Sequence, residues 1–98
     1  MPYVLRNRET NEIYTCTLIN NYDLPYYGTK YWDNHEEAVQ ERDSFLAAAQ
    51  VISLPLWDIH EVEEHQVKLF NVKLKNNPQR KLFLDAEGRT SITELPTT

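Results

Sequence analysis

The sequence predicts an α+β fold: a mostly antiparallel sheet, built from an N-terminal and a C-terminal β-hairpin, with one or two helices packed on one face. Three observations support this class. Segments rich in β-branched and aromatic residues lie near both ends of the chain. Polar turns separate the members of each pair. A segment whose apolar residues recur at helical spacing lies between the two hairpins.

The composition fits one small globular domain spanning residues 1–98. A chain of 98 residues is too short for two cores, and its 41% hydrophobic and 26% charged residues are ordinary for a folded domain. The single cysteine excludes an intramolecular disulfide. No apolar run approaches a membrane span and the N-terminus has no signal-peptide pattern, so we expect a cytoplasmic protein with no membrane partner.

Residues 3–19 predict the N-terminal hairpin. Residues 3–5 and 13–19 are its strands, and Asn11 closes the polar turn between them because Asn tolerates positive φ. If Leu5 pairs with Tyr14, then Cys16 lies on the same face as Leu5. Cys16 is then expected to be a small buried residue, since no His or Lys lies nearby in sequence to activate the thiol.

Residues 20–33 contain Asn, Asp, Pro and Gly at positions typical of a loop, with a short third strand expected at residues 29–32. A helix should begin at Asp33 or Asn34, either of which can cap it, with a Glu three residues on. Its apolar residues fall on one side, and the helix should continue to about Gln50.

Residues 57–76 allow two interpretations. The first is a second helix, capped by Asp58 or beginning near Glu61. Acidic residues near its start and lysines near its end would suit the helix dipole, and Asn76-Asn77-Pro78 would end it. The second is a pair of strands, because apolar and polar residues alternate around Phe70. We favour the helix from about Glu61, with a strand before it.

The C-terminal part predicts the second hairpin. Residues 81–85 and 89–94 are its strands, and Gly88 occupies a turn position that favours a left-handed backbone. The tail from Leu95 onward is expected to fray.

The charge is unevenly distributed. The formal net charge is −5, residues 35–65 hold eight acidic residues and one Arg, and residues 66–84 hold five basic residues and no acidic one. Internal pairing or solvated faces would account for this polarity. A symmetric dimer in which acidic and basic faces meet is the alternative.

No motif for catalysis, a cofactor or a metal is present. His60 and His65 are five residues apart, which places them on different sides of either a helix or a strand, so they cannot chelate one ion as a local pair. The chain has two glycines, sixty residues apart, and no nucleophile motif. We therefore expect a protein that is not an enzyme and that uses no cofactor and no metal.

The aromatic cluster in the expected loop is the first candidate binding site. It contains five of the eleven aromatic rings of the chain within eleven residues: Tyr22, Tyr26, Tyr27, Tyr31 and Trp32. Tyr and Trp offer large, rigid contact areas, although rings that fold back over the sheet would simply cap the core. The leading hypothesis is a non-catalytic interaction module that binds a protein partner, or a second copy of itself, through these rings.

The basic stretch is the second candidate. Its members are Lys68, Lys73, Lys75, Arg80 and Lys81. Clustered cations suit phosphate groups, and exposed rings nearby could stack on bases. The alternative function is therefore single-stranded nucleic-acid binding through residues 68–81, with the overall negative charge against it.

Overall fold

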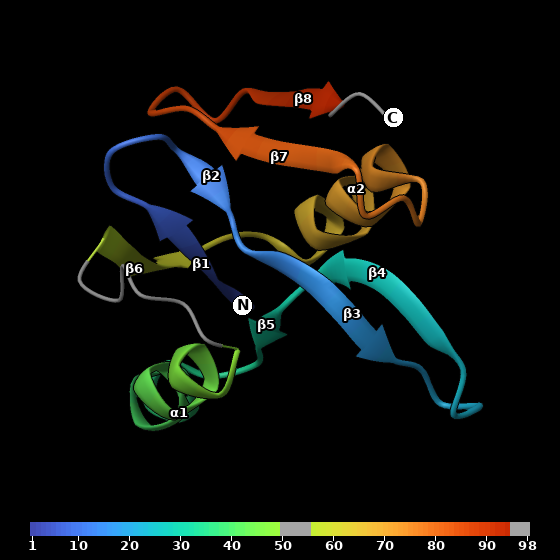
Figure 1. The fold of residues 1–98 in the computed structure, drawn as a ribbon. Coiled ribbons are helices and arrows are strands. Elements are labelled where there is room, and N and C mark those ends of the chain that lie inside the picture. The colour runs from blue at the N-terminus through green and yellow to red at the C-terminus, as the bar shows by residue number, and fades with distance from the viewer. Residues whose placement is uncertain (50–55, 95–98) are drawn as a thin grey trace.

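The structure, a computed structural model, describes residues 1–49 and 56–94 (Figure 1). The described elements follow the order β1 (Tyr3–Asn7), β2 (Glu12–Ile13), β3 (Thr15–Ile19), β4 (Pro25–Thr29), β5 (Tyr31–Trp32), α1 (His35–Ala48), β6 (Trp57–Glu61), α2 (Glu64–Leu74), β7 (Arg80–Leu84) and β8 (Thr90–Glu94). Every strand pairing is antiparallel. The chain is therefore an α+β protein with an antiparallel sheet, as the sequence predicted.

The main sheet is centred on β1. One edge of β1 pairs along its whole length with β6, from Tyr3 opposite Glu61 to Asn7 opposite Trp57. The other edge is shared, because β5 pairs with the first half of β1 and β2 pairs with the second half. β2 continues the sheet to β7 and β8.

The expected N-terminal hairpin forms, but its second strand is shorter than predicted. Asn11 has φ 67°, as expected for the turn, and the Tyr14 N–H donates to the Leu5 carbonyl at 2.9 Å. At Tyr14 the chain leaves the main sheet, and residues 15–19 become β3, which belongs to a separate two-stranded sheet. The predicted single strand over residues 13–19 is therefore two strands in two sheets.

The segment predicted as a loop is largely a second hairpin. β4 spans Pro25–Thr29 and pairs with all of β3, so only residues 20–24 form a turn. The pairing follows from the composition of the two segments, because Thr, Ile, Leu and Tyr fit a pleated surface. Figure 1 shows this hairpin extending as an arm away from the main sheet.

The first helix begins where the sequence predicted. Asn34 is its N-cap, and the Asn34 side chain accepts a hydrogen bond from the Glu37 backbone N–H at 2.7 Å. This bond satisfies one of the amides that have no partner within the helix. α1 ends at Ala48, and the expected end at Gln50 lies outside the described residues.

The favoured interpretation of residues 57–76 is confirmed. β6 comes first, and α2 begins at Glu64 with Glu63 as its cap, whose backbone N–H donates to the Gln66 side chain at 2.9 Å. Asp58 does not cap a helix: it lies in β6 and pairs with Arg8 at 2.9 Å. α2 stops where Lys75 and Asn76 turn left-handed, with φ 54° and 53°.

The two helices cover opposite faces of the sheet and do not share one face. Val4 packs in a buried cluster with α2 residues such as Phe70, whereas its neighbour Leu5 packs in a second cluster with α1 residues such as Leu46. Successive side chains of a strand point to opposite faces, so these clusters lie on the two sides of β1. The prediction of one face fails because Val4 and Leu5 are adjacent in β1 and both fully buried, so each face of this strand needs its own cover.

The C-terminal hairpin forms as predicted. β7 and β8 pair from Arg80 opposite Glu94 to Leu84 opposite Thr90, and Gly88 in the turn has φ 83°. Positive φ at that position costs little for glycine. The expectation for the tail from Leu95 onward concerns residues outside the described part of the chain.

Candidate functional site

The turn that joins β3 to β4 is held by a single asparagine. The Asn20 side-chain oxygen accepts hydrogen bonds from the backbone N–H groups of Tyr22 and Leu24, at 2.8 and 3.0 Å. The Asn20 N–H donates to the Leu24 carbonyl at 3.0 Å, and Asp23 takes φ 59°. Asn and Asp both tolerate this conformation, so the turn has a defined shape.

This turn and the strand ends beside it present apolar side chains to solvent. Tyr22 is 82% exposed, Ile19 62% and Leu24 58%. Pro25 is also exposed. We call Ile19, Tyr22, Leu24 and Pro25 the hairpin tip.

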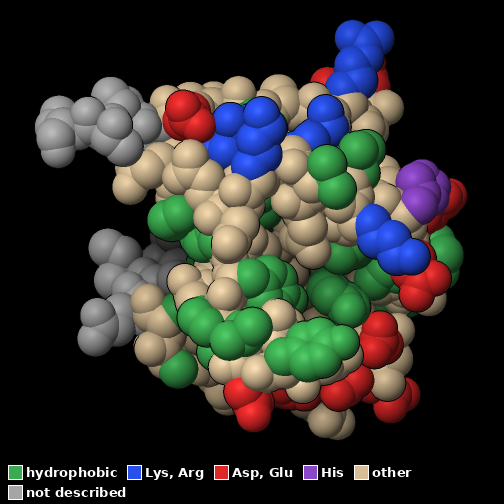
Figure 2. Space-filling view, turned by 90° about the vertical axis from the view of Figure 1, so that its right-hand side faces the viewer, with side chains coloured by type: hydrophobic (Ala, Val, Ile, Leu, Met, Phe, Trp, Pro, Cys, Tyr) green, Lys and Arg blue, Asp and Glu red, His purple; other side chains and the backbone are tan. Residues whose placement is uncertain are grey.

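Hydrophobic and charged side chains occupy different parts of the molecular face toward which the hairpin projects. Figure 2 shows hydrophobic side chains gathered over the lower half of this face, with acidic side chains below them and basic ones mainly above. Exposed apolar patches with a charged rim are typical of contact sites.

The hairpin is docked on α2 and on the loop after it through two asparagine side chains. The Thr29 N–H donates to Asn71 Oδ1 at 2.9 Å, and the Tyr27 N–H donates to Asn76 Oδ1 at 2.6 Å. The same outer edge of β4 begins with Pro25, which has no N–H to satisfy. The outward N–H groups of β4 are therefore bonded by the asparagines or removed by the proline.

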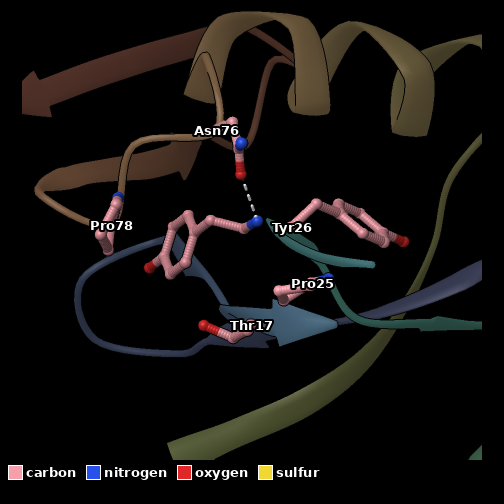
Figure 3. Close-up of a pocket in the computed structure, with 6 residues that line it drawn as sticks. Thr17, Pro25, Tyr26, Asn76 and Pro78 are labelled. Atoms are coloured by element: carbon pink, nitrogen blue, oxygen red, sulfur yellow. Dashed lines mark hydrogen bonds between the residues drawn. The ribbon is translucent and has the colours of Figure 1, made fainter. Parts of the chain in front are cut away.

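A shallow hollow of about 160 Å³ lies beside this docking point. It is lined by Thr17, Pro25, Tyr26, Tyr27, Asn76 and Pro78. Figure 3 shows the hydrogen bond that the β4 backbone donates to the Asn76 side chain at the hollow, and the Tyr26 ring directed away from Pro78 and Thr17. The hollow contains no carboxylate, imidazole or amine, and it is smaller than the roughly 300 Å³ typical of ligand pockets.

The five predicted aromatic residues are placed in three different settings. Tyr22 and Tyr31 are exposed, at 82% and 41%. Tyr26 and Tyr27 are half-buried, and the Tyr27 ring packs against the α2 cluster, with its hydroxyl 2.7 Å from the Thr15 hydroxyl. Trp32 is only 4% exposed and belongs to the α1 cluster. Only Tyr22 among them belongs to the hairpin tip.

Tyr26 lies over Gly28. A Cβ atom added at Gly28 would come within 2.8 Å of the Tyr26 ring and 3.0 Å of Asn71 Oδ1. Burial raises the pKa of the Tyr26 hydroxyl, with a smaller contribution from Tyr31. Glycine at position 28 therefore leaves the space that the Tyr26 ring occupies.

Cys16 is half-buried in the hairpin. Burial raises the pKa of the Cys16 thiol, and Lys30 opposes this effect with a smaller contribution. Lys30, which is distant in sequence, is the nearby cation that the sequence did not reveal. The thiol is nevertheless mostly protonated at neutral pH, as in a structural cysteine.

The basic stretch does not form one surface. Arg80 pairs with Glu94 at 3.0 Å, and its Nε donates to the Lys73 carbonyl at 2.8 Å. Lys81 lies 3.9 Å from Glu12. Leu82 faces α2, so the neighbouring Lys81 points to the other face of the sheet.

The three remaining basic side chains differ in exposure. Lys68 and Lys75 are exposed, and Lys73 is half-buried. Lys75 is the left-handed residue that follows α2, so it does not continue the helical face that contains Lys68.

The two histidines of the acidic run lie in different elements. His60 is in β6, where burial is the main cause of its lowered pKa, and His65 is in α2, where its Nδ1 lies 3.2 Å from Glu63. Among residues 1–49 and 56–94, no three His, Cys, Asp or Glu side chains are grouped so that they could hold a metal ion.

Several residues of the site were not predicted from the sequence. Ile19 and Leu24 of the tip and the docking residue Asn71 had no assigned role, and Asn76 and Pro78 were predicted only as part of a helix stop. The hairpin itself had a signal, since two β-type segments flank a run of Asn and Asp. The two docking hydrogen bonds had no signal in the sequence, because they join residues 42 and 49 positions apart.

Comparisons with protein-family models, with curated proteins and with solved structures found no match to this chain. Within the described ranges, neither helix is both long and apolar enough to cross a membrane.

Proposed function

We propose that this protein is a non-catalytic interaction module that binds a protein partner through the hairpin tip. The observation that carries the proposal is the exposure of Ile19, at the end of β3, and of Tyr22 and Leu24 in the turn that follows it. Apolar side chains gain free energy when a partner removes them from water, at about 25 cal/mol per Å². Aromatic residues are prominent among those that dominate interface energies.

The rigidity of the turn supports the same proposal. Four hydrogen bonds that involve Asn20 hold residues 20–24 before any partner arrives. A preorganised contact surface loses less conformational entropy on binding than a mobile one. The turn therefore presents Tyr22 at a low entropic cost.

The hollow beside the tip supports a protein partner over a small-molecule substrate. It is shallow, and its polar groups are hydroxyls and an amide already bonded to the β4 backbone. A neighbouring loop or helix of a partner can extend over such a surface, whereas a small ligand would remain largely in solvent.

The alternative of nucleic-acid binding receives less support. Two of its five cations lie near carboxylates, at 3.0 Å for Arg80 and 3.9 Å for Lys81, and Lys81 lies on the face opposite α2. Affinity for a phosphate backbone depends on several cations acting together. Lys68 and Lys75 alone would give weak, salt-sensitive association.

Site-specific photo-crosslinking tests the proposal. A benzophenone amino acid is placed at Tyr22 or, as a matched exposed control, at Val39 on α1, which is 53% exposed. In the native cells, we expect a discrete crosslinked protein at Tyr22 that is absent at Val39. Crosslinking at Tyr22 that is no more specific than at Val39 would contradict the proposal.

A pair of variants separates binding from folding. Tyr22→Ser combined with Leu24→Ser should abolish capture of the crosslinked protein, while Val39→Ser should not. All three side chains are exposed, so each change should alter the free energy of unfolding by about 0.5 kcal/mol or less. Capture that survives in the double variant would exclude the tip as the contact surface.

A further inference from the structure

The two edges of the β3–β4 hairpin differ in how their backbone groups are used. Asn20 N–H donates to the Leu24 carbonyl and Lys30 N–H donates to the Tyr14 carbonyl, so even-numbered residues on β3 bond to β4. In an antiparallel pair the bonding direction alternates along the strand. Thr15, Thr17 and Ile19 therefore direct their N–H and C=O groups away from β4.

The outer edge of β4 is protected, whereas the outer edge of β3 is not. Pro25, Asn71 and Asn76 remove or satisfy the outward N–H groups of β4. No strand among the described residues pairs with the free edge of β3. Residues 15–19 contain no proline and no charge, the usual devices that prevent an edge from pairing with another chain. In Figure 1, β3 forms the lower margin of the projecting hairpin.

We propose that a second copy of this chain pairs with this edge. The two β3 strands would run antiparallel about a two-fold axis at Thr17, which joins the two hairpins into one four-stranded sheet. In this register Thr17 lies opposite Thr17 of the second copy, Thr15 opposite Ile19, and Cys16 opposite Leu18. The contact is isologous, because each copy contributes the same residues.

The composition of the edge suits pairing with an identical strand. Each chain has a formal net charge of −5, yet residues 15–29 contain one charged residue, Asp23, which lies in the turn. Antiparallel pairing places the two turns at opposite ends of the joined sheet, so the Asp23 side chains are far apart. No like charges face each other across β3, and a Thr–Thr pair is favourable in a sheet.

The dimer would also stabilise an element that is weak by itself. A two-stranded hairpin is marginal in water, and three or more strands are needed for an independent sheet. Ile19, which is 62% exposed, would gain Thr15 of the second copy as a cross-strand neighbour. Five residues from each copy form a small interface, so we expect a weak and concentration-dependent dimer. The inference concerns the β3 edge and does not depend on partner binding at the tip.

Sedimentation velocity over a series from micromolar to millimolar protein tests the proposal. The mass should rise from the 11.6 kDa of one chain toward twice that value. Thr17→Lys and Thr17→Glu should each remain monomeric, because the axis places like charges opposite each other. An equimolar mixture of the two variants should dimerise again, since opposite charges then meet.

Matched controls separate this edge from other surfaces. Thr93→Lys, at an exposed threonine of β8, and Tyr22→Ser, at the tip, should both leave the dimer unchanged. Amide hydrogen exchange of the unmodified protein gives a readout without substitution. Exchange at Thr15, Thr17 and Ile19 should slow as the concentration rises.

Three results would overturn the proposal. A chain that remains monomeric up to millimolar concentration has no second copy at this edge, even if a foreign β-strand peptide binds there. A dimer that persists in both Thr17 variants pairs through another surface. Failure of the Lys and Glu variants to associate when mixed would exclude the two-fold axis at Thr17.

Discussion

Replacing Asn71 with alanine tests whether the hairpin is docked on α2 as described. The Asn71 side chain accepts the Thr29 N–H at 2.9 Å, and Thr29 is fully buried. Without this acceptor, the buried N–H would have no partner and no access to water. We therefore expect Asn71→Ala to destabilise the protein and to loosen the hairpin.

The magnitude follows from two opposing contributions. A buried N–H left without a partner costs about 1–3 kcal/mol. Alanine has a higher helix propensity than asparagine, so the substitution adds roughly 0.5–0.7 kcal/mol to the stability at a position in α2. The net loss should be about 1.5 kcal/mol, which lowers the thermal midpoint of a domain of this size by roughly 6–12 °C.

Two measurements check this prediction. Thermal and urea unfolding followed by circular dichroism give the global change, and amide exchange gives the local one at Thr29. Asn21→Ala, at an exposed turn position, is the control and should shift stability by less than about 0.5 kcal/mol. Asn76→Gly removes the second docking acceptor while keeping the positive φ at that position, and it should expose the Tyr27 amide to exchange.

The reasoning fails if Asn71→Ala is as stable as the unmodified protein and the Thr29 amide exchanges at the same rate. That pair of results would mean that Asn71 does not bind the β4 backbone in solution. A stability loss with unchanged exchange at Thr29 would place the effect within α2, away from the hairpin.

Three further predictions concern the hairpin and the sheet. Thr29→Val should raise the free energy of unfolding by about 1 kcal/mol, because the buried hydroxyl has no hydrogen-bond partner among the described residues. Urea unfolding measures this change, and a decrease in the free energy of unfolding of the same size would show that the hydroxyl is hydrogen-bonded. Gly28→Ala should lower the free energy of unfolding by roughly 1–2 kcal/mol and displace the Tyr26 ring. The NMR chemical shifts of that ring report the displacement, and unchanged shifts would contradict the contact. Burial lowers the pKa of His60 below its ordinary value of 6.5, so the unfolded chain binds this proton more readily. Stability should therefore fall as pH drops from above 6.5 through the folded pKa, and this part of the slope should be absent in His60→Gln; identical slopes would refute the assignment.

The elements whose signals are local could be predicted from the sequence. The cap at Asn34, the left-handed residues at Asn11 and Gly88, and the stop of α2 at Asn76 depend on side chains within a few residues of each site. Turn and cap chemistry of this kind is encoded in short segments. The α+β class follows from the order of these elements.

The arrangement of the hairpin could not be predicted in the same way. Residues 13–19 have the composition of one strand, and only the long-range contacts of Tyr14 show where it divides. The Tyr14 ring packs edge-on against Phe45 and Trp57, at centroid distances of 5.5 and 5.3 Å. This holds Tyr14 to the α1 side of the main sheet while the following residues leave it.

The aromatic residues illustrate the same limit. Tyr22 and Trp32 are ten positions apart in one cluster, yet one is 82% exposed and the other 4%. Composition cannot separate them, because both residue types suit a core and an interface. The separation comes from the pairing of β5 with β1, which places Trp32 opposite Tyr3 inside the sheet.

Docking on α2 couples the two surfaces proposed for the hairpin. Asn71 and Asn76 lie in and just after α2, so the hairpin reaches its final position only when α2 has formed. Loss of the Asn71 bond should therefore weaken both capture at the tip and pairing through β3. Changes at Tyr22 should affect capture alone, and changes at Thr17 should affect pairing alone. If Asn71→Ala left both activities intact, the hairpin would function as an independent arm and its attachment to α2 would be incidental.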